Sequence, residues 1–175
     1  ARPVGDPIGG TVAQAILNAL GLSATDAHPD LDVGVWSAGV PFIVIPLSSV
    51  DALGRAQVQL ADLESAIVAP AVGEVYLLAP AGDRHWRSRM FAPMFGIAED
   101  PATGSAACAA AGLLATIETD GLVTWVLEQG VEMGRRSLLH LSADVSGGAT
   151  TSVRLAGGAV LVGEGTLRLR AVTPE

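Results

Sequence analysis

The chain has 175 residues, of which 50% are hydrophobic and 16% charged, and its net charge is −8. All ten cations are arginines, so we do not expect the basic surface that nucleic-acid binding requires. No apolar run approaches the roughly 18–20 residues of a membrane-spanning helix, and no basic segment leads into an apolar one as in a signal peptide. The single cysteine, Cys108, excludes a disulfide within the chain. These features predict a cytoplasmic protein without nucleic-acid or membrane partners.

Residues 1–10 are rich in proline and glycine, which is typical of a leading loop or linker. Thr11 is placed to cap a helix that ends at Gly21. The apolar positions that follow Thr11 at helical spacing are Val12, Ala15, Ile16, Ala19 and Leu20. A polar loop over 23–30 comes next.

Short strands and helices alternate after this loop. In chain order they are strands over 33–38 and 40–47, helices over 49–56 and 61–67, and a strand pair over 74–80 and 84–92 joined by a turn at 81–83. Arg84, Arg87 and Arg89 lie on the last of these strands, where we expect a solvated face. Five further strands are predicted over 122–129, 137–145, 151–156, 159–165 and 166–172. Many short strands around few helices favour an α+β domain.

A helix over 105–115 has almost no large side chains. Its sequence, SAACAAAGLLA, is apolar on every side, so the helix should be buried all round. Alanine and glycine keep it narrow, and a curved sheet could therefore wrap closely around it. We predict an α+β fold in which this helix is central.

The start of that helix carries the candidate chemistry. Asp100 precedes a proline, which disfavours helical dihedral angles at Asp100, and Thr103 or Ser105 can cap the helix after the turn at Gly104. The first N–H groups of a helix lack internal partners and lie at its positive end, so they can bind a carboxylate or phosphate. An acid beside such a site can assist proton transfer. The alternative is a capped helix start with one solvated aspartate.

Other sites fit the sequence less well. The segment ATGSAA lacks the lysine of a phosphate-binding loop, and TGSAAC lacks the second glycine of a nucleophile elbow. We interpret Cys108 as a small core residue. The histidines His28, His85 and His140 have no spacing suited to a metal. We therefore expect neither a metal nor a cofactor.

Four segments resemble the phenazine biosynthesis PhzF-like family. They are SAGVPFIVIPL (37–47), RMFAP (89–93), GIAEDPATGSA (96–106) and EQGVEMGRRS (128–137). The resemblance covers roughly Val33 to Arg170. It implies the diaminopimelate epimerase-like fold, in which each of two similar domains wraps a curved, mostly antiparallel sheet around a central apolar helix.

The resemblance also assigns residues. It implies catalytic roles for Asp100, as the motif aspartate, and for Ser105, as the motif serine. Substrate binding would fall to Thr103 and to the backbone of Gly104, Ser105 and Ala106. Thr103 stands where the related epimerases keep a catalytic cysteine, so a two-thiol racemase mechanism is not expected. Arg136 replaces the proline that usually follows MGR in this family.

The family's first domain, with its TGNP-like and GHAT-like motifs and its glutamate acid/base, has no counterpart in this sequence. The resemblance therefore implies that residues 1–32 are a linker and the tail of that domain, and that 33–175 form the C-terminal domain. The implied function is that of half an isomerase that shifts a proton on a small carboxylate. Its partner would be the missing N-terminal domain, in cis or in trans. The alternative is a non-catalytic binding or assembly module, and the apolar composition is also compatible with a homodimer.

Overall fold

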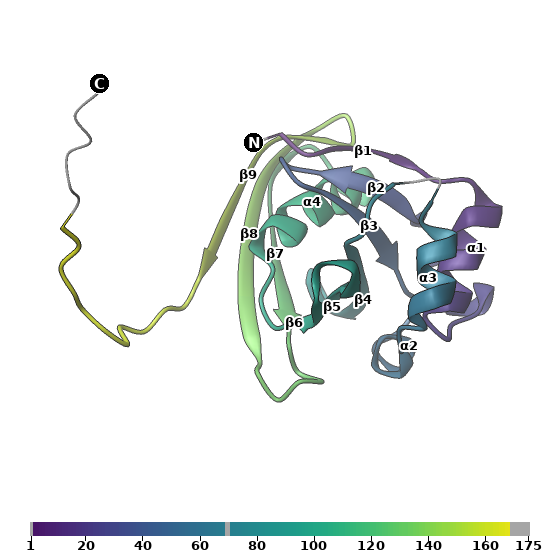
Figure 1. Cartoon of the computed structure of the whole chain (residues 1–175). Coiled ribbons are helices and arrows are strands. Elements are labelled where there is room, and N and C mark those ends of the chain that lie inside the picture. The colour runs from purple at the N-terminus through teal and green to yellow at the C-terminus, as the bar shows by residue number, and fades with distance from the viewer. Residues whose placement is uncertain (1, 69–70, 169–175) are drawn as a thin grey trace, which may run out of the picture.

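A computed structural model describes residues 2–68 and 71–168 of the protein (Figure 1). The strands are β1 (Val4–Pro7), β2 (Gly34–Ser37), β3 (Pro41–Pro46), β4 (Val75–Gly82), β5 (His85–Ala92), β6 (Ile97–Asp100), β7 (Gly121–Gln129), β8 (Ser137–Ser146) and β9 (Ala149–Gly157). The helices are α1 (Gly10–Ala19), α2 (Val50–Arg55), α3 (Leu60–Ala66) and α4 (Gly104–Leu114). None of these helices combines the length and the apolar character needed to cross a lipid bilayer.

The strands form one curled sheet in the order β1-β2-β3-β4-β5-β7-β8-β9, and β6 pairs with β5 off this path. The pairs β3–β4 and β5–β7 are parallel, and the other pairs are antiparallel. Figure 1 shows the sheet curving around α4. This arrangement confirms the predicted α+β fold with a mixed, mostly antiparallel sheet around a central helix.

Each face of the sheet has its own hydrophobic core because successive side chains of a strand point to opposite faces. On β3, Phe42 and Val44 join the core around α4, whereas Ile43 and Ile45 join the core under α1, α2 and α3. β4 alternates in the same way. The sheet is therefore covered by α4 on its inner face and by the three other helices on part of its outer face (Figure 1).

The small residues of α4 allow a close approach of the sheet. A Cβ atom at Gly112 would lie 2.7 Å from the ring of Trp36 on β2, so no larger residue fits there without a shift. Every residue of α4 from Ala106 onward is buried except Cys108, which is half-buried against the same core. The burial predicted from composition is thus confirmed for most of the helix, whereas Ser105 in its first turn is exposed.

The structure corrects the sequence predictions at both ends of the chain. The expected leading loop contains β1, whose backbone pairs with β2 despite its proline and glycine. α1 begins at Gly10 after an N-cap at Gly9, so Thr11 does not cap it. Ala15, placed on the apolar face by its spacing, is exposed, and Leu17 is buried instead.

The segment 159–165 forms no strand, and neither do 166–168. The rest of the strand predicted over 166–172 lies outside the described residues. An alternating apolar sequence forms a strand only with a neighbour to pair with, and no described strand pairs with this segment. The assignment of residues 1–32 to a preceding domain stays a prediction. In the structure, β1 and α1 pack with the sheet and with the outer-face core.

Candidate functional site

The candidate site lies where the chain passes from β6 into α4. Asp100 is the last residue of β6, and its position is fixed by pairing with Met90 on β5. Thr103 occupies the N-cap position of α4, and the helix begins at Gly104. The segment between them has no regular structure. The fold therefore brings Asp100, Thr103 and the first turn of α4 together, as the motif suggested.

Thr103 does not cap the helix with its side chain, contrary to expectation. Its hydroxyl instead donates to Asp100 Oδ2 at 2.5 Å. This bond leaves Asp100 Oδ1 without a hydrogen-bond partner in the described part of the chain. Ser105 does not cap the helix either, and its side chain is exposed. The two hydroxyls therefore have different environments: Thr103 is 8% exposed and holds the carboxylate, whereas Ser105 faces solvent.

Gln129, at the end of β7, is a part of the site that the sequence analysis missed. Its side chain is fully buried. Its Oε1 accepts from the Thr103 N–H at 3.1 Å, and its Nε2 donates to the Asp100 carbonyl at 2.7 Å and to Thr103 Oγ1 at 3.0 Å. Its only mark in the sequence is its place in the EQG segment of the resemblance, which does not say which residues it contacts.

The first turn of α4 presents backbone donors. The first helical bond runs from the Ala107 N–H to the Thr103 carbonyl at 3.0 Å. Among the described residues, no acceptor lies on the N–H groups of Gly104, Ser105 or Ala106. These groups lie at the positive end of the helix, where an anion is stabilised.

The surroundings of this turn are partly apolar and partly cationic. Leu155 of β9 lies over Gly104, since a Cβ atom there would be 2.5 Å from Leu155 Cδ2. Beside the turn, a hollow of about 560 Å³ is lined by Ala102 and by residues of β8 and its neighbours, including Arg136 and His140. Arg136, the residue that departs from the family's proline, lines this hollow, and its guanidinium is paired with Glu128.

The solvated face expected for three arginines is confirmed for Arg84, which is exposed, and is wrong for Arg87 and Arg89 on β5, which are largely buried and paired with acids. Arg89 is buried at 8% exposure, and its guanidinium binds both carboxylate oxygens of Glu99, at 2.8 and 2.9 Å. It also donates to the carbonyls of Leu53 and Ala56 at the end of α2. Alternation along the strand predicted that Arg89 is exposed. It could not show the acceptors on β6 and α2 that allow the guanidinium to be buried.

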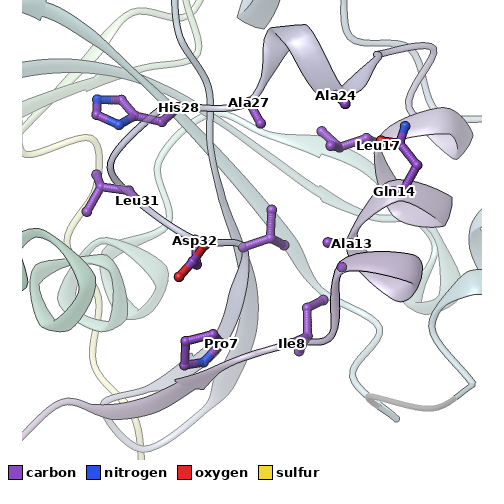
Figure 2. A pocket seen from close by; sticks show the side chains of 12 residues that line it. Pro7, Ile8, Ala13, Gln14, Leu17, Ala24, Ala27, His28, Leu31 and Asp32 are labelled. Atoms are coloured by element: carbon purple, nitrogen blue, oxygen red, sulfur yellow. The ribbon is translucent and has the colours of Figure 1, made fainter.

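The other titratable groups are not part of this site. Burial raises the pKa of the half-buried Cys108 thiol, which fits a core residue rather than a nucleophile. Across residues 2–68 and 71–168, no three His, Cys, Asp or Glu side chains are grouped to hold a metal. A separate hollow lies between α1 and the segment 27–33, where Gln14 and Asp32 supply polar side chains (Figure 2). None of the candidate residues lines it.

The sequence matches the family described as phenazine biosynthesis-like protein, PhzC-PhzF, over residues 7–165. An uncharacterized isomerase of Mesorhizobium japonicum is 38% identical over 165 residues, which cover 88% of this chain and 54% of that protein. The trans-2,3-dihydro-3-hydroxyanthranilate isomerase of Pseudomonas fluorescens is 35% identical over 163 residues, which cover 88% of this chain and 52% of that enzyme. The chain therefore spans about half the length of the curated relatives it matches.

The fold has a similar counterpart among solved structures. The crystal structure of a PhzF-family phenazine biosynthesis protein from Bacillus anthracis aligns with a TM-score of 0.72. The alignment covers 91% of this chain and 59% of that chain, at 17% sequence identity. This likeness shows the shared curled sheet and packed helix.

Proposed function

The chain belongs to the phenazine biosynthesis-like PhzC-PhzF family, and from that membership we propose that it is the C-terminal half of an isomerase. Its substrate is a small carboxylate, on which the completed enzyme moves a proton between carbon atoms. The observation that carries the proposal is the placement of Asp100 next to three unpaired N–H groups at the start of α4.

This placement suits the chemistry of a proton shift. The reaction needs a substrate carboxylate held in place and an acid/base held over the neighbouring carbon. The N–H groups of Gly104 and Ser105, in the accessible part of the first turn, bind the carboxylate, and the helix dipole favours its negative charge. Ala106 is fully buried, so its N–H acts through the dipole. Asp100 Oδ1 is the oxygen free to give or take a proton, since Oδ2 is occupied by the Thr103 hydroxyl.

The chain supplies only part of the cleft in this proposal. It spans about half of its relatives, and the family resemblance implies that the principal glutamate belongs to the other half. Glu99, the glutamate next to Asp100, is tied to Arg89 instead. A half-cleft also leaves its substrate in water, where electrostatic stabilisation is weak.

The test compares the chain alone with the chain supplied with an N-terminal half, in trans or as a fusion. The assay is deuterium exchange into trans-2,3-dihydro-3-hydroxyanthranilate, the compound named for the Pseudomonas fluorescens relative, and into a panel of small carboxylates. We expect exchange only when both halves are present. Robust exchange by the 175-residue chain alone would overturn the half-enzyme proposal. No exchange by a folded two-half protein on any of these compounds would overturn the isomerase assignment.

A further inference from the structure

We propose that Gln129 is a positioning residue that sets the direction of the Thr103 hydroxyl and thereby selects Asp100 Oδ1 as the proton-exchanging oxygen. The inference rests on the proposed function and deepens it. The amide of Gln129 is fully buried and contacts both ends of the segment between β6 and α4.

The orientation of this amide follows from its fixed partners. The Asp100 carbonyl can only accept a hydrogen bond, so it must face the Gln129 NH₂ group, and the distance is 2.7 Å. The Thr103 N–H can only donate, so it must face Gln129 Oε1, at 3.1 Å. A flipped amide would set donor against donor and acceptor against acceptor. The backbone therefore fixes which end of the amide is the donor.

The fixed amide in turn directs the Thr103 hydroxyl. The second N–H of Gln129 Nε2 donates to Thr103 Oγ1 at 3.0 Å, so the hydroxyl accepts there. Its own proton is then directed to Asp100 Oδ2, 2.5 Å away. Because Oδ2 always accepts from Thr103, a proton that Asp100 exchanges with a substrate must be carried on Oδ1.

The amide is anchored in the inner core. Tyr76 is fully buried, and this burial raises the pKa of its hydroxyl, which therefore stays protonated and acts as a donor. It donates to Ser88 Oγ at 2.9 Å and points toward Gln129 Oε1 at 3.4 Å. Ser88 is the register partner of Gln129 across the β5–β7 pair. The amide thus lies at the paired strands β5 and β7, whereas the segment that it binds, between β6 and α4, has no regular backbone pairing.

Gly130 allows the two segments to approach. Its φ is +79°, which favours glycine, and a Cβ atom there would lie 2.8 Å from the Pro101 carbonyl oxygen. The end of β7 therefore reaches the backbone that follows Asp100 only because this position lacks a side chain. Gln129 and Gly130 therefore both contribute to the contact between the end of β7 and the segment that follows Asp100.

The test uses a two-half protein that catalyses deuterium exchange and four variants of this chain. Gln129→Met removes every polar contact of the amide at similar volume, and Thr103→Val removes only the hydroxyl. Thr103→Ser keeps the hydroxyl. Ser88→Ala is the matched control, because it breaks the same buried network at Tyr76 without touching Thr103 or Asp100.

We expect Gln129→Met and Thr103→Val each to lower kcat about 10- to 100-fold with KM within about threefold, because misplacement of a reacting group acts on the chemical step. The double variant should be no slower than the slower single variant, because both changes break one chain. Thr103→Ser should keep most of the kcat that Thr103→Val loses. Ser88→Ala should lower the unfolding free energy yet keep kcat within about threefold of the unmodified protein.

Several results would overturn the role. They are unchanged kcat in Gln129→Met, losses that multiply in the double variant, or a loss in Ser88→Ala equal to that in Gln129→Met. If Gln129→Met does not fold, the contrast between Thr103→Val and Thr103→Ser decides, since equal kcat in both would contradict a directed hydroxyl. An inactive two-half protein without substitutions would overturn the proposed function itself, whereas an active one with an unaffected Gln129→Met would overturn only the positioning role.

Discussion

Glu99 and Asp100 are neighbours on β6, yet their carboxylates lie on opposite faces of the sheet. Glu99 is bound by Arg89, which also reaches the end of α2 on the outer face. Asp100 accepts from Thr103 at the start of α4. The alternation of side chains along a strand separates the two acids completely. One of them is part of an ion pair that links elements of the fold, and the other faces the start of α4.

Asp100→Asn should lower exchange activity of the two-half protein about 10²- to 10⁴-fold, the range that general acid–base groups contribute. The amide keeps the shape of the carboxylate and an oxygen that can accept from Thr103. The unfolding free energy and circular dichroism spectrum should therefore change little. Glu99→Gln is the matched control, and it should affect stability more than kcat. Unchanged kcat/KM in Asp100→Asn would reduce Asp100 to part of the helix start.

Inorganic phosphate titrated into the ¹⁵N-labelled chain should shift the amide signals of Gly104, Ser105 and Ala106 in a saturating manner. Their N–H groups have no acceptor among the described residues, and they lie at the positive end of the helix. The first turn of α1 is the internal control, because it is a helix start without a side-chain cap. Equal, non-saturating shifts at the two helix starts would contradict a specific anion site.

Arg89→Met should lower the unfolding free energy by about 3–5 kcal/mol, because it leaves the Glu99 carboxylate unpaired in a nearly buried position. The Arg89 and Glu99 side chains are only 10% and 15% exposed. The substitution also removes the donor to the last carbonyls of α2. Urea unfolding measures the change, and Arg89→Met/Glu99→Gln should lose less than the sum of the single changes. A loss below about 1 kcal/mol would show that this pair behaves like an exposed one.

The pair of Glu128 and Arg136 should make stability depend on pH. A hydrogen bond from Arg136, helped by the charges of Arg136 and Arg87, holds the pKa of Glu128 below its ordinary value of 4.5, although burial opposes this. A depressed pKa in the folded state adds stability above that ordinary value, and the added stability is lost as pH falls through the folded-state pKa.

Arg136→Gln should therefore be less stable than the unmodified chain at pH 6, and the difference should shrink toward pH 3. Arg136 is 59% exposed, so the difference at pH 6 should not exceed about 1 kcal/mol. It should fall further in 1 M salt, where exposed charges are screened. Urea unfolding at several pH values gives the comparison, and a difference that grows as the pH falls would have the wrong sign.

The parts of the fold that sequence could predict are those with a local signature. A helix that is apolar on every side has to be buried, and α4 is. Regular alternation correctly placed the strands that pair along their full length, such as β7 and β8. β1 was missed because backbone pairing with β2 outweighs its local composition, which contains glycine and proline. The segment 159–165 was assigned wrongly because its alternation says nothing of whether a partner strand is present.

The candidate site divides in the same way. The placement of Asp100 and Thr103 at the start of the helix could be predicted because the motif that carries them is contiguous in the sequence. Gln129 could not be predicted as their partner, since it is 26 residues from Thr103 and no local pattern records that distance. Arg89 was misjudged for the same reason, because its acceptors belong to α2 and β6.

The central strands of the sheet meet through the parallel pairs β3–β4 and β5–β7, each of which joins segments that are far apart in the chain. The entropy of closing these segments is lost before the strand pairs can stabilise the fold. Folding is therefore slow compared with that of helical proteins. α4 lies in the segment between β5 and β7, and it has no polar face that could keep it soluble as an isolated helix. It can gain its packing only as the sheet closes around it, so helix and sheet should form in one cooperative step. The amide protons of its buried turns should then exchange with solvent only when the whole domain unfolds.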